Sequence, residues 1–191
     1  ISKKNILINA PSYIMFHSAK SFLTNKENLR NFKAFYDKMI NNDEGSVVLD
    51  IGANIGYTSI LFHEYFFNQR IIAIEASSMH MEYLQNNIKD YERIEAIESL
   101  VYSEQKHLSL SMPSNLPNYK SKKTGLLSIY GNDLHEGNIY STTIDLLVEK
   151  NLKNNERISF IKMDIEGSEY KALLGCERCI NSYQPIFLVE L

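Results

Sequence analysis

Residues 46–57 of the chain read SVVLDIGANIGY. The first six, 46–51, are mostly apolar and predict a buried strand, and a helix is expected over 57–67. Gly52 and Gly56 lie between these elements, and a glycine turn at this point lets the backbone approach a ligand more closely than a Cβ atom would allow. Because ligands of open α/β sheets bind at the carboxyl ends of the strands, the turn marks a candidate binding site.

Short apolar strands and amphipathic helices alternate on both sides of this stretch. Strands are predicted at 70–75, 93–98, 158–163 and 185–191, and helices at 78–91, 143–150 and 168–180. The alternation predicts an α/β fold, namely a Rossmann-like, doubly wound, mostly parallel sheet with helices on both faces. Residues 103–141 interrupt the pattern, with strands expected at 108–112 and 126–130 around a loop that contains prolines and lysines.

The length of 191 residues favours a single domain, and no linker divides the chain. We expect residues 1–44 to form an N-terminal extension with a helix over 27–41, and residues 45–191 to form the ligand-binding domain. The net charge of -3 gives no reason to expect a nucleic-acid partner. No apolar run approaches the roughly 20 residues that a membrane span needs.

The chain contains two cysteines, Cys176 and Cys179. Two cysteines are too few for a disulfide scaffold, so a reducing, cytoplasmic location is the default expectation. One C-x-x-C pair cannot supply the four ligands of a zinc site, and we interpret both residues as small buried hydrophobic side chains.

Glu75 ends the second strand, 25 residues after Asp50. A carboxylate at that position can accept hydrogen bonds from ribose hydroxyls, so the glycine turn and Glu75 together predict a nucleoside-binding site. The dinucleotide motif G-x-G-x-x-G is incomplete, because Tyr57 replaces its third glycine. S-adenosylmethionine (SAM) has no phosphate but has an ammonium group, which Asp50 could meet directly or through water. A tight strand–helix connection without any ligand is the simplest alternative.

A second motif, residues 160–169, reads FIKMDIEGSE and also joins a strand to a helix. It brings three carboxylates, Asp164, Glu166 and Glu169, to one strand end, where like charges repel unless they are compensated. Asp164 or Glu166 could accept the proton of an acceptor hydroxyl or orient the acceptor. Alternatively, the three acids could bind a divalent cation, or Glu169 could simply favour the helix dipole.

The ordered motifs 48–56, 74–75, 141–145, 161–169 and 189–190 resemble those of FkbM-type methyltransferases, a class I family. The resemblance covers about residues 45–191. It implies a SAM-dependent O-methyltransferase that acts on a hydroxyl of a sugar, glycan or other small molecule. It also implies SAM contacts from Asp50, Gly52, Asn54, Gly56 and Glu75, and an adenine contact from Glu98 and Ser99.

The chain departs from the family pattern in two places. Ala76 follows Glu75 where the family usually has proline, and the chain stops at Leu191, in the fifth strand, so we expect the C-terminal strands of the class I sheet to be missing. Two other functions remain open: a nicotinamide-dependent oxidoreductase and a SAM-binding module without catalysis. His63 and His80 fall in predicted helices and are expected to be structural or exposed.

Overall fold

The structure is a computed structural model that describes residues 30, 45–66, 68–110 and 139–190. Its main sheet has five strands in the order β3-β2-β1-β7-β8, and every neighbouring pair is parallel. The strands are β1 (Ser46–Ile51), β2 (Arg70–Glu75), β3 (Ile94–Glu98), β7 (Arg157–Met163) and β8 (Ile186–Val189). The strand order reverses between β1 and β7, which is where an open α/β sheet binds its ligand.

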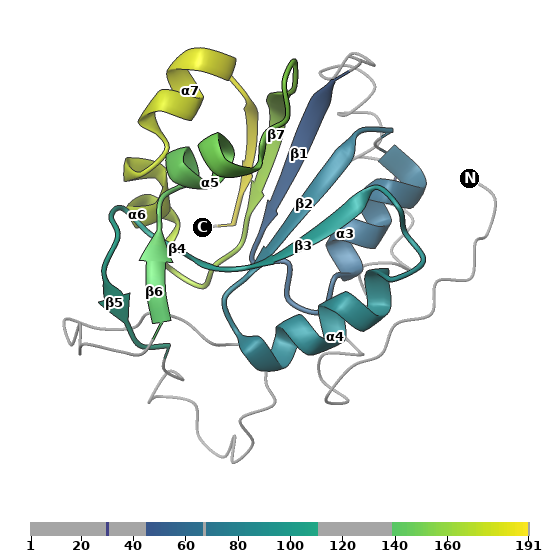
Figure 1. Ribbon diagram of the computed structural model, residues 1–191, viewed down its shortest axis with the longest axis horizontal. Coiled ribbons are helices and arrows are strands. Elements are labelled where there is room, and N and C mark those ends of the chain that lie inside the picture. The colour runs from purple at the N-terminus through teal and green to yellow at the C-terminus, as the bar shows by residue number, and fades with distance from the viewer. Residues whose placement is uncertain (1–29, 31–44, 67, 111–138, 191) are drawn as a thin grey trace.

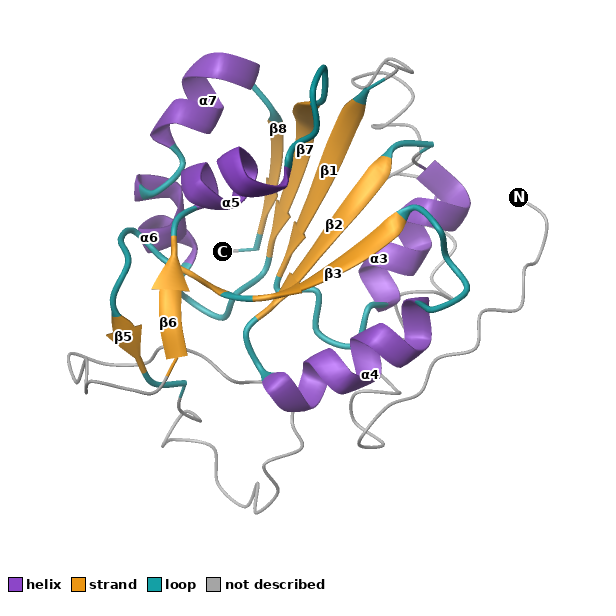
Figure 2. Cartoon of the chain, in the orientation of Figure 1, coloured by secondary structure: helices purple, strands orange, loops and turns teal. Residues whose placement is uncertain are grey.

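Helices cover both faces of this sheet (Figures 1 and 2). One face carries α3 (Tyr57–Leu61), which continues as a π-helical turn (Phe62–Phe66), and α4 (Ser78–Ile88). The other face carries α5 (Ile144–Asn151), α6 (Glu169–Leu174) and α7 (Glu177–Tyr183). The predicted doubly wound α/β class is confirmed.

Alternation along β1 explains the two layers, since successive side chains of a strand point to opposite faces. Val48 packs in the cluster that contains Ile60 of α3 and Leu84 of α4. Val47 and Leu49 pack in the other cluster, which contains Leu147 of α5. Both faces of β1 are therefore buried, as expected for a parallel sheet between helices.

A smaller three-stranded sheet lies beside the main one, in the order β4-β6-β5. It consists of β4 (Leu100–Val101), β5 (His107–Leu108) and β6 (Ile139–Thr142), with β4 parallel and β5 antiparallel to β6. The sequence did not predict β4 or β6. Of the strand predicted at 108–112, only Leu108 is in a strand; residues 109–110 are described but not in one, and 111–112 lie outside the described residues. The predicted strand at 126–130 and the helix at 27–41, apart from Arg30, also lie outside them.

The helix predicted over 168–180 was wrong as one continuous element. The structure has two helices, α6 and α7, separated at Gly175 and Cys176. A Cβ atom on Gly175 would lie 2.6 Å from the carbonyl oxygen of Tyr102, so this glycine allows the break to pack against the end of β4. Cys176 and Cys179 are both free and buried in the core, as predicted. None of the described helices is long and apolar enough to cross a membrane.

Candidate functional site

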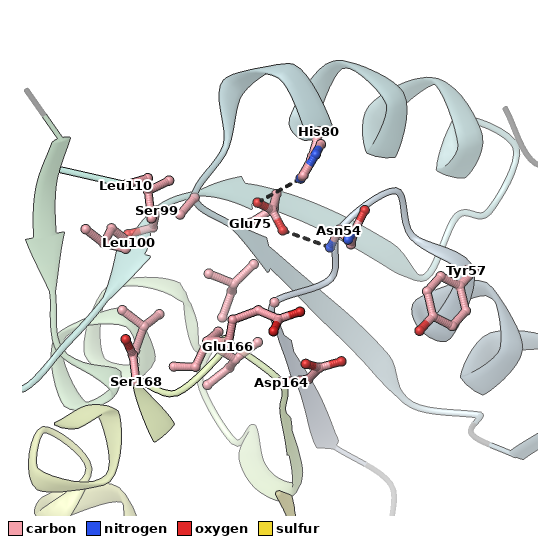
Figure 3. A pocket seen from close by; sticks show the side chains of 16 residues that line it. Asn54, Tyr57, Glu75, His80, Ser99, Leu100, Leu110, Asp164, Glu166 and Ser168 are labelled. Carbon is pink, nitrogen blue, oxygen red and sulfur yellow. Dashed lines mark hydrogen bonds and ion pairs between the residues drawn. The ribbon is translucent and has the colours of Figure 1, made fainter. Parts of the chain in front are cut away.

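A pocket opens at the carboxyl ends of β1, β2 and β7, and 16 residues line it (Figure 3). Of the predicted site residues, it brings together Gly52, Asn54, Glu75, Ser99, Asp164 and Glu166. The others, Asp50, Gly56, Glu98 and Glu169, are not among its lining residues. The two sequence motifs therefore meet at one site, but not with every residue that was assigned to it.

Glu75 lies at the centre of the pocket and is almost completely buried. Its Oε2 accepts a hydrogen bond from the backbone N–H of Asn54 at 2.8 Å, and its Oε1 accepts one from the N–H of Ser77 at 2.8 Å. These bonds fix the carboxylate between the glycine turn and the start of α4. Each carboxylate oxygen can accept two hydrogen bonds, so the group can still accept bonds from a ligand.

Gly52 is required for a reason that the sequence did not reveal. Its φ is +77°, and a Cβ atom there would lie 1.8 Å from the backbone oxygen of Asp164. The missing side chain thus lets the two strand ends approach each other, rather than making room for a ligand. Gly56 has φ +89°, and its Cβ would lie 2.7 Å from Leu84 Cδ1, so this glycine serves the packing of α3 against α4.

Asp50 is fully buried in β1 and does not reach the pocket. Its Oδ2 accepts a hydrogen bond from Ser59 Oγ at 2.5 Å, and its Oδ1 lies 3.2 Å from the ammonium of Lys162. Both carboxylate oxygens of Asp50 thus face groups inside the protein, and the contact between Asp50 and a cofactor ammonium, direct or through water, stays a prediction.

Asp164 and Glu166 follow β7 and line the pocket. Glu166 has φ +54°, an unusual value for a residue with a side chain, so its backbone is held in a strained conformation. Burial raises the pKa of the half-buried Glu166 carboxyl, and the neighbouring charges of Asp164, Glu190 and Glu169 raise it further. A carboxylate with a raised pKa is a stronger base than an ordinary one.

Glu169 has a structural role at the start of α6. Its Oε1 accepts hydrogen bonds from the N–H of Ile165 at 2.9 Å and from that of Gly167 at 3.2 Å. The side chain therefore closes the loop that carries Asp164 and Glu166, instead of joining them as a third ligand. Among the residues that the structure describes, no group of three His, Cys, Asp or Glu side chains is placed to hold a metal ion.

Glu98 and Ser99, the predicted adenine contacts, have different surroundings at the end of β3. Ser99 lines the pocket, and its N–H donates to the Glu75 carbonyl at 2.9 Å. Glu98 is exposed and accepts a hydrogen bond from Ser78 Oγ at 2.5 Å. Ser99 therefore lines the pocket and Glu98 does not, and the adenine contact of both residues stays a prediction.

The two sides of the pocket differ in polarity (Figure 3). Leu100 and Leu110 lie on one side of Glu75 and belong to a small apolar cluster with Ala76, which also lines the pocket. Asn54, Tyr57 and Asp164 lie on the other side. A ligand that spans the pocket would thus meet an apolar surface at one end and polar groups at the other.

The model of the methyltransferase FkbM domain matches residues 50–191 of the chain. The chain belongs to the FkbM methyltransferase family. The expected family resemblance is confirmed, and the matched region includes both motifs that form the pocket.

Solved structures similar to this FkbM-family chain include the precorrin-6y C5,15-methyltransferase of Geobacter metallireducens GS-15, with 13% identity and a TM-score of 0.47 over 95% of this chain and 66% of that one. The O-methyltransferase from Bacillus cereus, solved with SAH, has 14% identity and a TM-score of 0.41 over 91% of this chain and 69% of that one. PRMT6 has 21% identity and a TM-score of 0.35 over 45% of this chain. The chain spans 66% of the length of the first structure and 25% of the PRMT6 chain. A comparison with curated proteins finds no match.

Ten of the 16 lining residues of the FkbM-family pocket were not predicted as site residues, among them Tyr57, His80 and Leu110. His80, which was expected to be structural or exposed, is 2% exposed and lines the pocket, and its Nδ1 lies 3.6 Å from Glu75 Oε1. The signal was its position five residues after Glu75, in the first turn of the following helix. Glu190 belongs to the family motif at 189–190, and no site role was predicted for it. A hydrogen bond to Asp164 and the charge of Asp164 raise the pKa of Glu190.

Proposed function

We propose that this domain binds SAM in the pocket and transfers its methyl group to a hydroxyl of a small molecule or glycan. The observation that carries the proposal is the fixed position of Glu75 between an apolar side and a polar side of one pocket. Ribose hydroxyls would bind the free acceptor positions of Glu75. The adenine would lie toward Leu100 and Leu110, and the amino-acid end toward Asn54 and Asp164.

The residues fit this ligand chemically. The oxygen Oδ1 of Asn54 is buried and has no hydrogen-bond partner among the described residues, so a donor such as the ligand ammonium would satisfy it. When bound, SAM supplies a methyl group already activated by its sulfonium. The main work of the protein is then to position the acceptor, and a carboxylate of Asp164 or Glu166 takes the proton that the acceptor hydroxyl loses.

The first experiment is calorimetry with SAM, S-adenosylhomocysteine (SAH) and NAD⁺. We expect the wild-type protein to bind SAM and SAH, and Glu75→Ala to weaken binding roughly 100-fold, because two hydrogen bonds to a charged acceptor are lost at about 1.5 kcal/mol each. The matched control is Glu98→Ala, since Glu98 ends the neighbouring strand in register with Glu75 but is exposed and is not among the lining residues of the pocket. Binding of NAD⁺ without SAM would instead favour an oxidoreductase.

The second experiment tests transfer itself. Labelled SAM is incubated with pools of sugars, glycans and hydroxylated small molecules, and the label should appear on oxygen. Glu166→Gln should bind SAM but lower the transfer rate about 100-fold or more, which is the usual contribution of a general base. Asp164→Asn should lower the rate as well, and should also weaken SAM binding because Asp164 faces the amino-acid end. SAM binding with no transfer to any pool would leave a non-catalytic binding module, and label on carbon or nitrogen would refute O-methylation.

A further inference from the structure

Lys162 lies in the middle of a buried polar cluster directly behind the pocket. Its side chain is 9% exposed, and its ammonium contacts three oxygen atoms. The Gly52 carbonyl oxygen is 3.0 Å away, Asp50 Oδ1 is 3.2 Å away, and Asp164 Oδ2 is 3.5 Å away. These atoms come from the glycine turn, from β1 and from the end of β7, so one side chain joins all three segments.

The register of the sheet explains how the cluster forms. Lys162 of β7 is the parallel partner of Asp50 of β1, and the two side chains lie on the face that α3 covers, where Ser59 donates to Asp50. An ammonium has three N–H donors and no acceptor, and three oxygen atoms surround it here. The ammonium donates a hydrogen bond to the Gly52 carbonyl and forms ion pairs with the carboxylates of Asp50 and Asp164.

The charge of Lys162 is stable in this environment. Burial alone lowers the pKa of the amine, but the facing carboxylates of Asp50 and Asp164 outweigh it, so the pKa of Lys162 lies above its ordinary value. The ammonium in turn compensates Asp50, which is fully buried. Lys162 itself is not among the lining residues of the pocket, whereas Gly52 and Asp164 are.

We propose that Lys162 is a positioning residue that shapes the polar side of the pocket, by holding the Gly52 carbonyl and the Asp164 carboxylate in place for the amino-acid end of SAM. This inference rests on the proposed function, since it concerns one end of the ligand proposed there. It assigns to Lys162 and Asp50 together a role that acts through other residues, without contact to the ligand.

The test compares two ligands that differ only at the end concerned. SAH carries the amino-acid end, and 5′-methylthioadenosine lacks it. Lys162→Met alone leaves a buried carboxylate unpaired and is expected to unfold readily, so the informative variant is Asp50→Asn/Lys162→Met, which removes both charges of the pair. Its folding is checked by circular dichroism and thermal unfolding, and both affinities are measured by calorimetry.

We expect the double variant to lose roughly tenfold in SAH affinity, the equivalent of one hydrogen bond to a charged group, while its 5′-methylthioadenosine affinity stays within about twofold of wild type. A merely structural role would weaken both ligands equally, and an unchanged SAH preference would also overturn the proposal. A wild-type protein that binds neither ligand would overturn the proposed function and this inference together. Wild-type binding with equal losses in the double variant would overturn the role of Lys162 alone.

Discussion

Replacing Gly52 with alanine should destabilise the protein far more than the same change at Gly167. The two glycines have similar backbone conformations, with φ of +77° and +94°. An alanine in this left-handed region costs about 1–2 kcal/mol for either residue. They differ in their surroundings, because a Cβ atom on Gly167 would meet nothing within 4 Å, whereas one on Gly52 would lie 1.8 Å from the Asp164 carbonyl oxygen.

The additional penalty at Gly52 follows from that overlap. The Asp164 carbonyl must retreat by more than about 1 Å before even a 3.0 Å contact is reached. The backbone N–H of Asp164 donates a hydrogen bond to the Ile51 carbonyl at 3.1 Å. A shift of the Asp164 backbone therefore also weakens the junction of β1 and β7. Overpacking of this kind costs about 1–3 kcal/mol and a lost hydrogen bond about 1 kcal/mol. We therefore expect about 3–6 kcal/mol for Gly52→Ala and about 1–2 kcal/mol for Gly167→Ala.

Urea unfolding at 25 °C, followed by circular dichroism, measures both values against wild type. Native domains have about 5–15 kcal/mol of stability in total, so Gly52→Ala should be partly unfolded or close to it. Gly56→Ala should fall between the two, because the Leu84 side chain that it meets at 2.7 Å can change its rotamer. Equal stabilities for the Gly52 and Gly167 variants would refute the claim that a backbone contact fixes the glycine.

Two further predictions concern charged side chains. The pKa of Glu166 is raised in the folded protein, so its ionised form opposes folding, and the stability that its protonated form provides is lost as pH rises above about 4.5. Glu166→Gln should therefore be more stable than wild type at about pH 7 and equally stable near about pH 4. The difference at about pH 7 should be less than about 1 kcal/mol, because solvent screens a half-exposed charge, and unfolding curves at both pH values check it. Asp145 accepts hydrogen bonds from the N–H groups of Arg178 (3.0 Å) and Cys179 (2.8 Å) at the start of α7. Asp145→Ala should lower the free energy of unfolding in urea by about 1–2 kcal/mol. Glu149→Ala removes only an exposed contact to Arg178 and should lower it by less than about 0.5 kcal/mol. Equal losses for the two variants would contradict the capping role of Asp145.

The charged side chains near the pocket fall into a buried pair and a group of more exposed acids. Inside, Lys162 and Asp50 compensate each other in the sheet. Near the surface, burial and then the charge of Asp164 raise the pKa of Glu166, and a hydrogen bond to Asp164 together with its charge raises the pKa of Glu190. Lys162 also contacts the Asp164 carboxylate at 3.5 Å, so the inner pair reaches this acid as well, while Glu166 lines the pocket.

The order and type of the principal elements were predictable from local patterns. The apolar runs at β1, β2 and β7 and the periodicity of α4 and α5 follow from neighbours within a few residues, and the structure confirms them. The break between α6 and α7 was not predictable, since it depends on how closely Gly175 approaches Tyr102, 73 residues earlier in the chain. The short strands β4 and β6 likewise depend on pairing across an intervening segment.

The site divides in the same way. The sequence by itself determined that a glycine turn, Glu75 and the acids after β7 meet at one end of a parallel sheet, because strand direction and alternation place them there. Only the tertiary structure decided which of these residues face the pocket. Asp50 is turned inward because its strand partner is Lys162, and Glu169 is turned away because two backbone N–H groups bind it. Those outcomes depend on contacts between distant segments, and the glycine of the turn is required for the same reason: another strand end occupies the space that its side chain would fill.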